Sequence, residues 1–329
     1  MRFLIDNKNS HDPSVNLALE EYAVRNLNPQ NEYILLYIND KSVILGRHQN
    51  AWEEINFDYI KNKAIQVVRR ISGGGTVYQD LGNLNFSYII NYERWKFNNY
   101  RLFTTPIINA LLDLNIKAEL NNHNAIVVGN KKISGNAQFT RKNSMISHGT
   151  LLFNSDLECL TQVLEGKKKN IKSRAIKSIP SPVANISDFL KRKMSITGFK
   201  QHLINHLFSN AKHIPVFKFS KKEWKEILLL AEDKYQNWDW NFGESPQFTI
   251  VNFKDSIDGR QETEITIKKG KIIDIKISSN LKISKSIINS LKNIPYREED
   301  IRPVLLKLRH LFSDKEKNIK DLSDLILEI

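Results

Sequence analysis

The chain has 329 residues, 41% of them hydrophobic, which is enough for a packed core and for two domains. Its single cysteine, Cys159, excludes an internal disulfide, and the sequence contains neither a signal peptide pattern nor an apolar run of membrane-spanning length. The formal net charge of +13 favours acidic partners. We therefore expect a cytoplasmic protein that does not associate with membranes.

The chain begins with a predicted helix that Asp12 caps, because a short side-chain oxygen before an apolar run satisfies free backbone N–H groups. Two strands, Tyr33 to Ile38 and Ser42 to Arg47, are predicted to pair through the short turn between them. A helix over Asn56 to Lys63 then leads to a core strand, Ile65 to Arg70.

The stretch from Arg69 to Ser87, RRISGGGTVYQDLGNLNFS, predicts a strand, a glycine loop, a strand, a turn and a further strand. Three consecutive glycines, Gly73 to Gly75, lack Cβ atoms, so a ligand can lie directly on their backbone. Arg69 and Arg70 place fixed positive charge beside that loop, which suits a carboxylate or a phosphate.

The rest of the chain alternates between helical and extended patterns. The expected elements are a helix at 101–114, strands at 117–120, 125–128, 131–140 and 145–153, helices at 156–164, 186–192, 197–208 and 221–235, a linker at 238–246, strands at 248–253, 262–268 and 272–277, and three terminal helices. The acid-free run Lys167 to Lys177 is too irregular for a helix and is interpreted as a basic loop or a solvated face.

A second stretch with candidate functional residues is Gly129 to Gln138, GNKKISGNAQ, which contains two adjacent lysines. Lysine is a compact point charge, which suits a phosphate whose charge grows in a transition state. Four blocks, in this order, resemble the lipoate–protein ligase family, whose fold is shared with the catalytic domain of biotin protein ligases. They are Arg69 to Gly75, Gly82 to Phe86, Lys132 to Ala137 and His148 to Leu151.

The resemblance implies an α+β fold, with mixed sheets flanked by helices and a small α+β accessory domain at the C-terminus. The expected domains are residues 1–243, catalytic, and 244–329, accessory. The implied reaction is the ATP-dependent ligation of lipoate to a lysine through lipoyl-AMP. The implied acceptors are acidic lipoyl domains, of 2-oxoacid dehydrogenase E2 subunits or the glycine-cleavage H protein. Neither nucleic acid nor a membrane is expected as a partner.

The family's functional residues carry over to matching positions of this chain. The resemblance makes Lys132 the catalytic lysine and implies ATP, lipoate as substrate and Mg²⁺ at a site that the sequence does not define. The positions implied for the lipoyl group and its carboxylate are Arg70, Ser72, Gly73, Gly74, Gly75 and His148, and those for the adenylate are Val77, Tyr78, Asn83 and Lys132.

Two departures from the family pattern bear on the nucleotide. Ala125 stands where the family usually has an aspartate that is thought to help hold magnesium, and alanine cannot ligate a metal. Pro180 and Pro182 stand where the family usually has arginines, which removes two positive charges and stiffens the segment.

Alternative functions on the same fold stay open at this point. A cysteine-dependent octanoyl or lipoyl amidotransferase needs a reactive thiolate, and Cys159 is the only candidate, although its apolar neighbours indicate a buried structural residue. A non-catalytic paralogue that binds lipoyl-adenylate or acceptor domains is favoured by the two departures, and the retained Lys132 argues against it. Biotin ligases differ in their glycine-rich signature.

Overall fold

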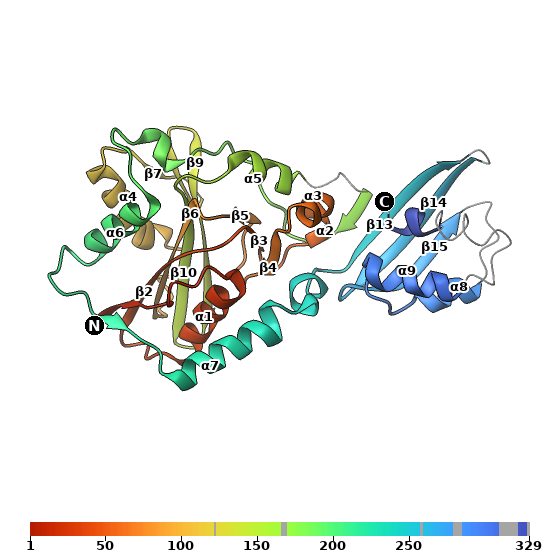
Figure 1. Cartoon of the computed structure of the whole chain (residues 1–329), viewed down its shortest axis with the longest axis horizontal. Coiled ribbons are helices and arrows are strands. Elements are labelled where there is room, and N and C mark those ends of the chain that lie inside the picture. The colour runs from red at the N-terminus through yellow and green to blue at the C-terminus, as the bar shows by residue number, and fades with distance from the viewer. Residues whose placement is uncertain (122, 166–169, 257–258, 279–284, 309–321, 328–329) are drawn as a thin grey trace. The chain divides into compact units, whose positions relative to one another are not determined.

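The computed structural model describes residues 1–121, 123–165, 170–256, 259–278, 285–308 and 322–327. The chain forms two compact units: the first comprises residues 1–47, 57–165 and 178–237, and the second residues 48–56, 166–177 and 238–329. The two units therefore alternate along the sequence (Figure 1). The catalytic and accessory domains expected at 1–243 and 244–329 stay predictions.

A large mixed sheet forms the centre of the first unit. Its strand order is β12-β1-β2-β6-β10-β9-β8-β7; β1 is parallel to both of its neighbours, and the other pairs are antiparallel. The bounds are β1 (Arg2–Ile5), β2 (Glu32–Ile38), β6 (Asn83–Asn91), β7 (Glu119–Leu120), β8 (Ala125–Val128), β9 (Lys131–Arg141), β10 (Ser144–Leu152) and β12 (Val216–Phe217).

A second, three-stranded sheet in this unit carries the glycine loop. Strand β3 (Ser42–Leu45) is parallel to β4 (Gln66–Arg69) and antiparallel to β5 (Val77–Gln79). The predicted pairing of the strands on either side of Asp40 is wrong, because β2 pairs with β6 in the large sheet. Asn39 is buried and bonded to two amide side chains, and the chain passes there from one sheet to the other.

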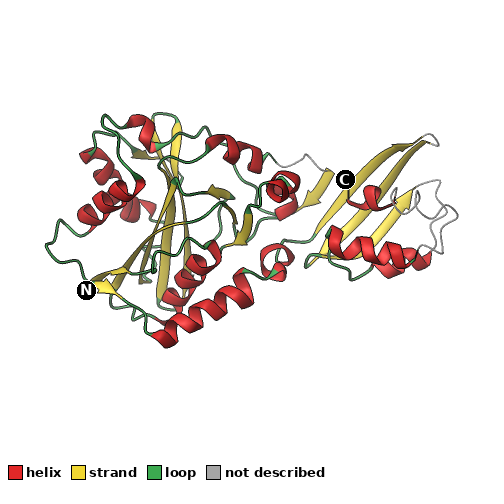
Figure 2. Cartoon of the chain, viewed as in Figure 1, coloured by secondary structure: helices red, strands yellow, loops and turns green. Residues whose placement is uncertain are grey.

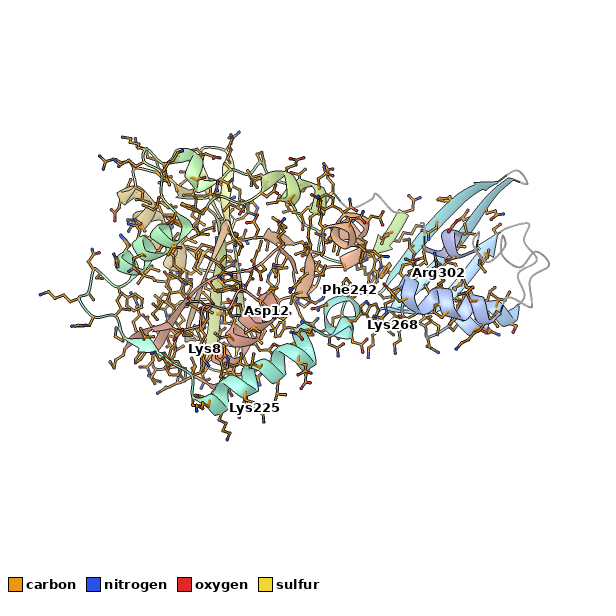
Figure 3. The ribbon with its side chains drawn as sticks, viewed as in Figure 1. Lys8, Asp12, Lys225, Phe242, Lys268 and Arg302 are labelled. Carbon is orange, nitrogen blue, oxygen red and sulfur yellow. The ribbon has the colours of Figure 1, made fainter. Side chains whose placement is uncertain are left out.

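Helices cover both faces of the large sheet. One face carries α1 (Pro13–Asn26), whose N-cap is Asp12 as predicted, and α7 (Lys221–Leu230) packs on α1 (Figures 1 and 3). The opposite face packs against α4 (Tyr100–Asp113) and α6 (Ile196–Leu207) around a core that includes Phe86, Phe103 and Phe199. The remaining elements are α3 (Phe57–Asn62), α5 (Leu157–Leu164), the 3₁₀ turn η1 (Ile186–Phe189) and the π-helical turn η2 (Ala231–Tyr235).

The second unit is a small α+β arrangement (Figure 2). Its sheet has the order β11-β13-β14-β15, and buried isoleucines of these strands and of two helices supply its core. The bounds are α2 (Ala51–Glu54), β11 (Asn170–Ser173), η3 (Asp239–Gly243), β13 (Phe248–Ser256), β14 (Gly259–Lys268), β15 (Lys271–Ser278), α8 (Lys285–Leu291) and α9 (Glu298–Lys307); residues 322–327 are also helical.

Three local expectations change in the structure. Residues 167–169 of the basic run lie outside the described residues, whereas the next part of the run forms β11, which pairs with β13. The linker expected at 238–246 contains the helical turn η3, and the helix expected at 186–192 is only the turn η1. Among the described helices, none is long and apolar enough to cross a membrane.

Candidate active site

One row of residues crosses the large sheet on the face that α1 covers. Tyr37 on β2 pairs with Asn85 on β6, which pairs with Thr150 on β10. The Thr150 hydroxyl accepts from the backbone N–H of Gly135 on β9 at 3.3 Å, and Gly135 pairs with Ala125 on β8. Since directly paired residues share a face, these five positions line one surface.

The glycine loop beside this surface is closed by one guanidinium group. Arg70, which follows β4, donates from Nη2 to the carbonyl oxygens of Gly73 and Gly75 at 2.6 and 2.8 Å. It also donates from Nη1 to the carbonyl of Ile44 at 3.1 Å and from Nε to the hydroxyl of Ser72 at 3.0 Å. Four of its five N–H groups are therefore used within the protein, so Arg70 fixes the shape of the loop and supplies charge to it.

Burial alters the acid–base properties of Arg70. The loss of solvent lowers its pKa to about 10, while the nearby charge of Glu20 opposes that shift. The guanidinium stays protonated at neutral pH. A buried cation whose N–H groups are mostly used within the protein contributes a fixed positive charge to the site rather than a mobile clamp for a ligand.

A hydrogen-bonded chain joins this loop to α1. His148 on β10 lies with its Nε2 2.7 Å from the hydroxyl of Ser72 and its Nδ1 2.9 Å from Oε2 of Glu20. The hydroxyl of Tyr37 donates to Oε1 of the same carboxylate at 3.2 Å. Because an ionised carboxylate can only accept, Nδ1 of His148 is the donor in the bond to Glu20.

Lys132 stands apart from these bonded groups. It is half-buried on β9, and its Nζ lies 3.1 Å from the position that a Cβ on Gly135 would occupy. Burial, and then the charge of Arg70, lower the pKa of Lys132 below its ordinary value. The strand is held in place by a covering segment, since the Lys132 N–H donates to Pro182 at 2.8 Å and its carbonyl accepts from Ala184 at 3.1 Å.

The residues predicted to bind the adenylate lie at the start of β5 and β6. Val77 and Tyr78 are neighbours on β5, so their side chains point to opposite faces. Tyr78 is buried, and burial, followed by neighbouring Cys159 on α5, raises its pKa. Asn83 opens β6 and is fully buried.

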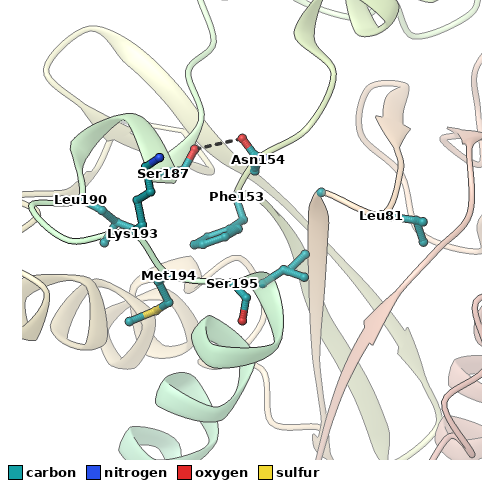
Figure 4. A pocket seen from close by; sticks show the side chains of 10 residues that line it. Leu81, Phe153, Asn154, Ser187, Leu190, Lys193, Met194 and Ser195 are labelled. Atoms are coloured by element: carbon teal, nitrogen blue, oxygen red, sulfur yellow. Dashed lines mark hydrogen bonds between the residues drawn. The ribbon is translucent and has the colours of Figure 1, made fainter.

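A cavity of about 690 Å³ lies elsewhere in this unit, between the end of β10 and the start of α6 (Figure 4). Phe153, Met194 and Ser195 line it, and Ser187 donates to Oδ1 of Asn154 across one side at 3.4 Å. It does not contain Arg70, Lys132 or His148, so its size alone does not identify the reactive centre.

Comparisons with known proteins identify the family. The profile of the lipoyl protein ligase A/B catalytic domain matches residues 12–208, and that of the bacterial lipoate protein ligase C-terminus matches residues 245–326. Lipoate-protein ligase LplJ of Bacillus subtilis (strain 168) is 44% identical over 330 residues, which cover 98% of this chain and 99% of that protein. The chain belongs to the lipoate–protein ligase family.

Two solved structures agree with this assignment. Lipoate-protein ligase A bound with ATP has a TM-score of 0.60 and 29% identity, over 74% of this chain and 97% of that one. A structure from a bi-partite lipoate protein ligase and its E2 lipoyl domain from Thermoplasma acidophilum has a TM-score of 0.62 and 27% identity, over 74% and 95% of the two chains. The predicted family, α+β fold class and ATP-dependent ligase activity are confirmed.

The magnesium ion that the ligase family implies does not fit the residues around Lys132. Magnesium prefers carboxylate and water oxygens, whereas β8 places Val127 opposite Lys132 and the methyl group of Ala125 opposite the neighbouring Gly135. The amide oxygen of Asn121 is already used by two backbone N–H groups. Within the described ranges, no group of three His, Cys, Asp or Glu could hold a metal. The residues around Lys132 therefore provide no set of ligands for a magnesium ion.

Two residues of this ligase site were not predicted from the sequence: Glu20 and Tyr37. Both are buried, at 1% and 3% exposure. The available signal was the pair of adjacent carboxylates, Glu20 and Glu21, inside a helix with apolar neighbours on every side. Buried carboxylates need partners, so this pair already required cations or hydroxyl donors from other elements. Glu21 is satisfied differently, by Arg25, Lys234 and Tyr235.

Proposed function

We propose that this ligase activates lipoate with ATP to lipoyl-AMP and then transfers the lipoyl group to a lysine of an acidic acceptor lipoyl domain. The observation that carries this proposal is the placement of Lys132 beside a glycine loop that Arg70 closes: it is a half-buried ammonium group that has no carboxylate partner among the residues that the structure describes. Such a cation is compensated only when an anion enters the site.

In the first step, a carboxylate oxygen of lipoate bonds to the α-phosphorus of ATP, and the bond from that phosphorus to pyrophosphate breaks. Negative charge grows on the oxygens of the α-phosphate, where Lys132 would stabilise it. Arg70 holds the Gly73 to Gly75 backbone in place and adds charge to it. No covalent enzyme nucleophile is needed, because positioning and electrostatics supply the acceleration.

In the second step, the uncharged amine of the acceptor lysine bonds to the lipoyl carbonyl carbon, and the bond to AMP breaks. The amine loses its proton to solvent, and AMP leaves as the anion. Complementary charge supports an acidic acceptor, since residues 246–329 carry only +3 of the net +13 and the remaining charge lies in the part with the glycine loop.

The half-reaction without acceptor tests the proposal. With lipoate and ATP alone, the protein should release one pyrophosphate per active site and retain lipoyl-AMP. An amidotransferase that uses Cys159 would release no pyrophosphate and would become acylated instead. A binding paralogue would do neither. Release of pyrophosphate that does not depend on lipoate would also contradict the proposal.

A further inference from the structure

Five buried amide side chains form a continuous chain from α1 to the start of β6. Their exposed fractions do not exceed 4%. They come from α1, the β2–β3 connection, β5 and β6, so four separate elements contribute to one hydrogen-bonded line. In order, they are Asn16, Asn39, Gln79, Asn85 and Asn83.

One end of this chain is anchored by a backbone carbonyl. The amide nitrogen of Asn16 donates to the carbonyl oxygen of Ser10 at 2.9 Å and to Oδ1 of Asn39 at 2.8 Å. A carbonyl oxygen can only accept, so Asn16 must present its nitrogen there. Asn7 agrees with this orientation, because its nitrogen donates both to Ser10 and to Oδ1 of Asn16, each at 3.0 Å.

Each later amide in the chain is oriented by its hydrogen bond to the one before it. The nitrogen of Asn39 donates to Oε1 of Gln79 at 2.6 Å, and the nitrogen of Gln79 donates to Oδ1 of Asn85 at 2.7 Å. The nitrogen of Asn83 donates to the same Asn85 oxygen at 3.1 Å. Reversal of any one amide would set oxygen against oxygen or nitrogen against nitrogen, so the carbonyl of Ser10 determines the orientation of every member.

The other end of the chain is an unused acceptor. Within the described residues, Oδ1 of Asn83 is buried and has no hydrogen-bond partner. A buried acceptor without a donor is unfavourable, and a ligand N–H group that bonds to it would remove that cost. Asn83 and Asn85 lie on the same face of β6, and Asn85 belongs to the row that ends beside Lys132.

We propose that this amide chain selects the nucleotide base. By holding Oδ1 of Asn83 as a fixed acceptor, it favours a purine with an amino group at position six over one with a carbonyl oxygen there. The inference rests on the proposed function and on the prediction that Asn83 binds the adenylate. Asn39 and Gln79 act only through Asn83, so they are positioning residues for base recognition.

The matched probes are ATP and ITP, which differ in the amino or carbonyl group at position six and in the neighbouring N1, which carries a hydrogen only in ITP. The wild-type ligase should prefer ATP in kcat/KM by about 100-fold, because a site built to accept from a donor leaves its acceptor facing the carbonyl of ITP. The substitution Asn39→Asp offers only acceptors to Gln79. It should therefore reverse Gln79, Asn85 and Asn83 in turn and present the Asn83 nitrogen to the base. The ATP-to-ITP ratio should fall below one.

Two further variants keep this test decisive. Asn205→Asp adds the same charge on the exposed side of α6 and should leave the ratio unchanged. Gln79→Met interrupts the chain without adding a buried charge, so it serves if Asn39→Asp does not fold, and it should bring the ratio close to one. A wild-type ligase that transfers lipoate with ATP but shows no preference, or folded variants that keep the full preference, would overturn the inference. If the wild-type protein forms no lipoyl-AMP, the proposed function itself is wrong.

Discussion

Lys132 is the residue on which the proposed chemistry depends most. Lys132→Ala should lower lipoyl-AMP formation by at least about 100-fold, because a cation beside developing charge is worth several kcal/mol in a partly dry site. The neighbouring exposed Lys131 provides the matched control, and Lys131→Ala should keep nearly full activity. Pre-steady-state formation of lipoyl-AMP measures the step directly. Equal losses in the two variants would mean that Lys132 has no specific role.

The lowered pKa of Lys132 makes a prediction about pH. The free enzyme must bind ATP with this amine protonated, so kcat/KM for ATP should fall on the alkaline side with an apparent pKa below the ordinary value of 10.5. Lys132→Arg keeps its charge at these pH values, so its profile should lose that alkaline limb. Identical profiles for the two proteins would contradict the assignment.

The same shift predicts a change in stability. A buried ammonium group is unfavourable in the folded protein, so the free energy of unfolding should rise with pH between the lowered pKa and 10.5. Below both values the cost is fully present. Lys132→Met should therefore raise the melting temperature at neutral pH while it abolishes activity. A lower melting temperature for Lys132→Met would show that the lysine stabilises the fold.

At the residue scale, the sequence predicted site residues that stand in motif blocks, and it gave no indication of buried residues that only the fold brings near them. Arg70, Ser72 and His148 form one bonded cluster in the structure, as their shared assignment to the lipoyl site required. Glu20 and Tyr37 join that cluster from α1 and β2, far away in sequence. The ligand contacts of the cluster stay a prediction.

At the scale of elements, the glycine loop offers a test with a built-in control. Gly74 has a φ of +86°, and a Cβ there would lie 3.0 Å from Nη2 of Arg70. Gly74→Ala should cost about 1–2 kcal/mol of stability from the left-handed backbone and should displace Arg70, so activity falls as well. At Gly73 an added Cβ meets nothing within 4 Å, and Gly73→Ala should leave stability within about 0.5 kcal/mol. Urea unfolding compares the two; equal stabilities would contradict the described loop.

Elements with strong local patterns were predictable, and the pairing of strands was not. The Asp12 cap predicted the start of α1, and the helix expected at 101–114 agrees with α4 to within one residue at each end. Nothing in the alternation of β2 and β3 shows that they belong to different sheets, because that depends on the buried bonds of Asn39. The short strands β1 and β12 were also missed, since two to four residues carry little periodicity, whereas β5 was predicted because it stands between the glycine loop and a turn.

For the whole molecule, the family resemblance of the four motif blocks was sufficient to predict an α+β ligase, and the family profiles confirm it. The assignment of residues 48–56 and 166–177 to the second compact unit was not predictable, because it arises from tertiary contacts such as the pairing of β11 with β13. The expected cytoplasmic location stays a prediction, as does the preference for an E2 subunit or the H protein as acceptor.

The measurement that tests the central proposal most directly is the intact mass of an acceptor lipoyl domain after incubation with this protein, lipoate, ATP and magnesium, beside the variants Cys159→Ser and Lys132→Ala. We expect the acceptor to gain one lipoyl group with the wild-type protein and with Cys159→Ser, and none with Lys132→Ala. A gain that needs Cys159 or a pre-activated lipoyl donor, or no gain with the wild-type protein, would contradict ATP-dependent ligation at the site around Lys132.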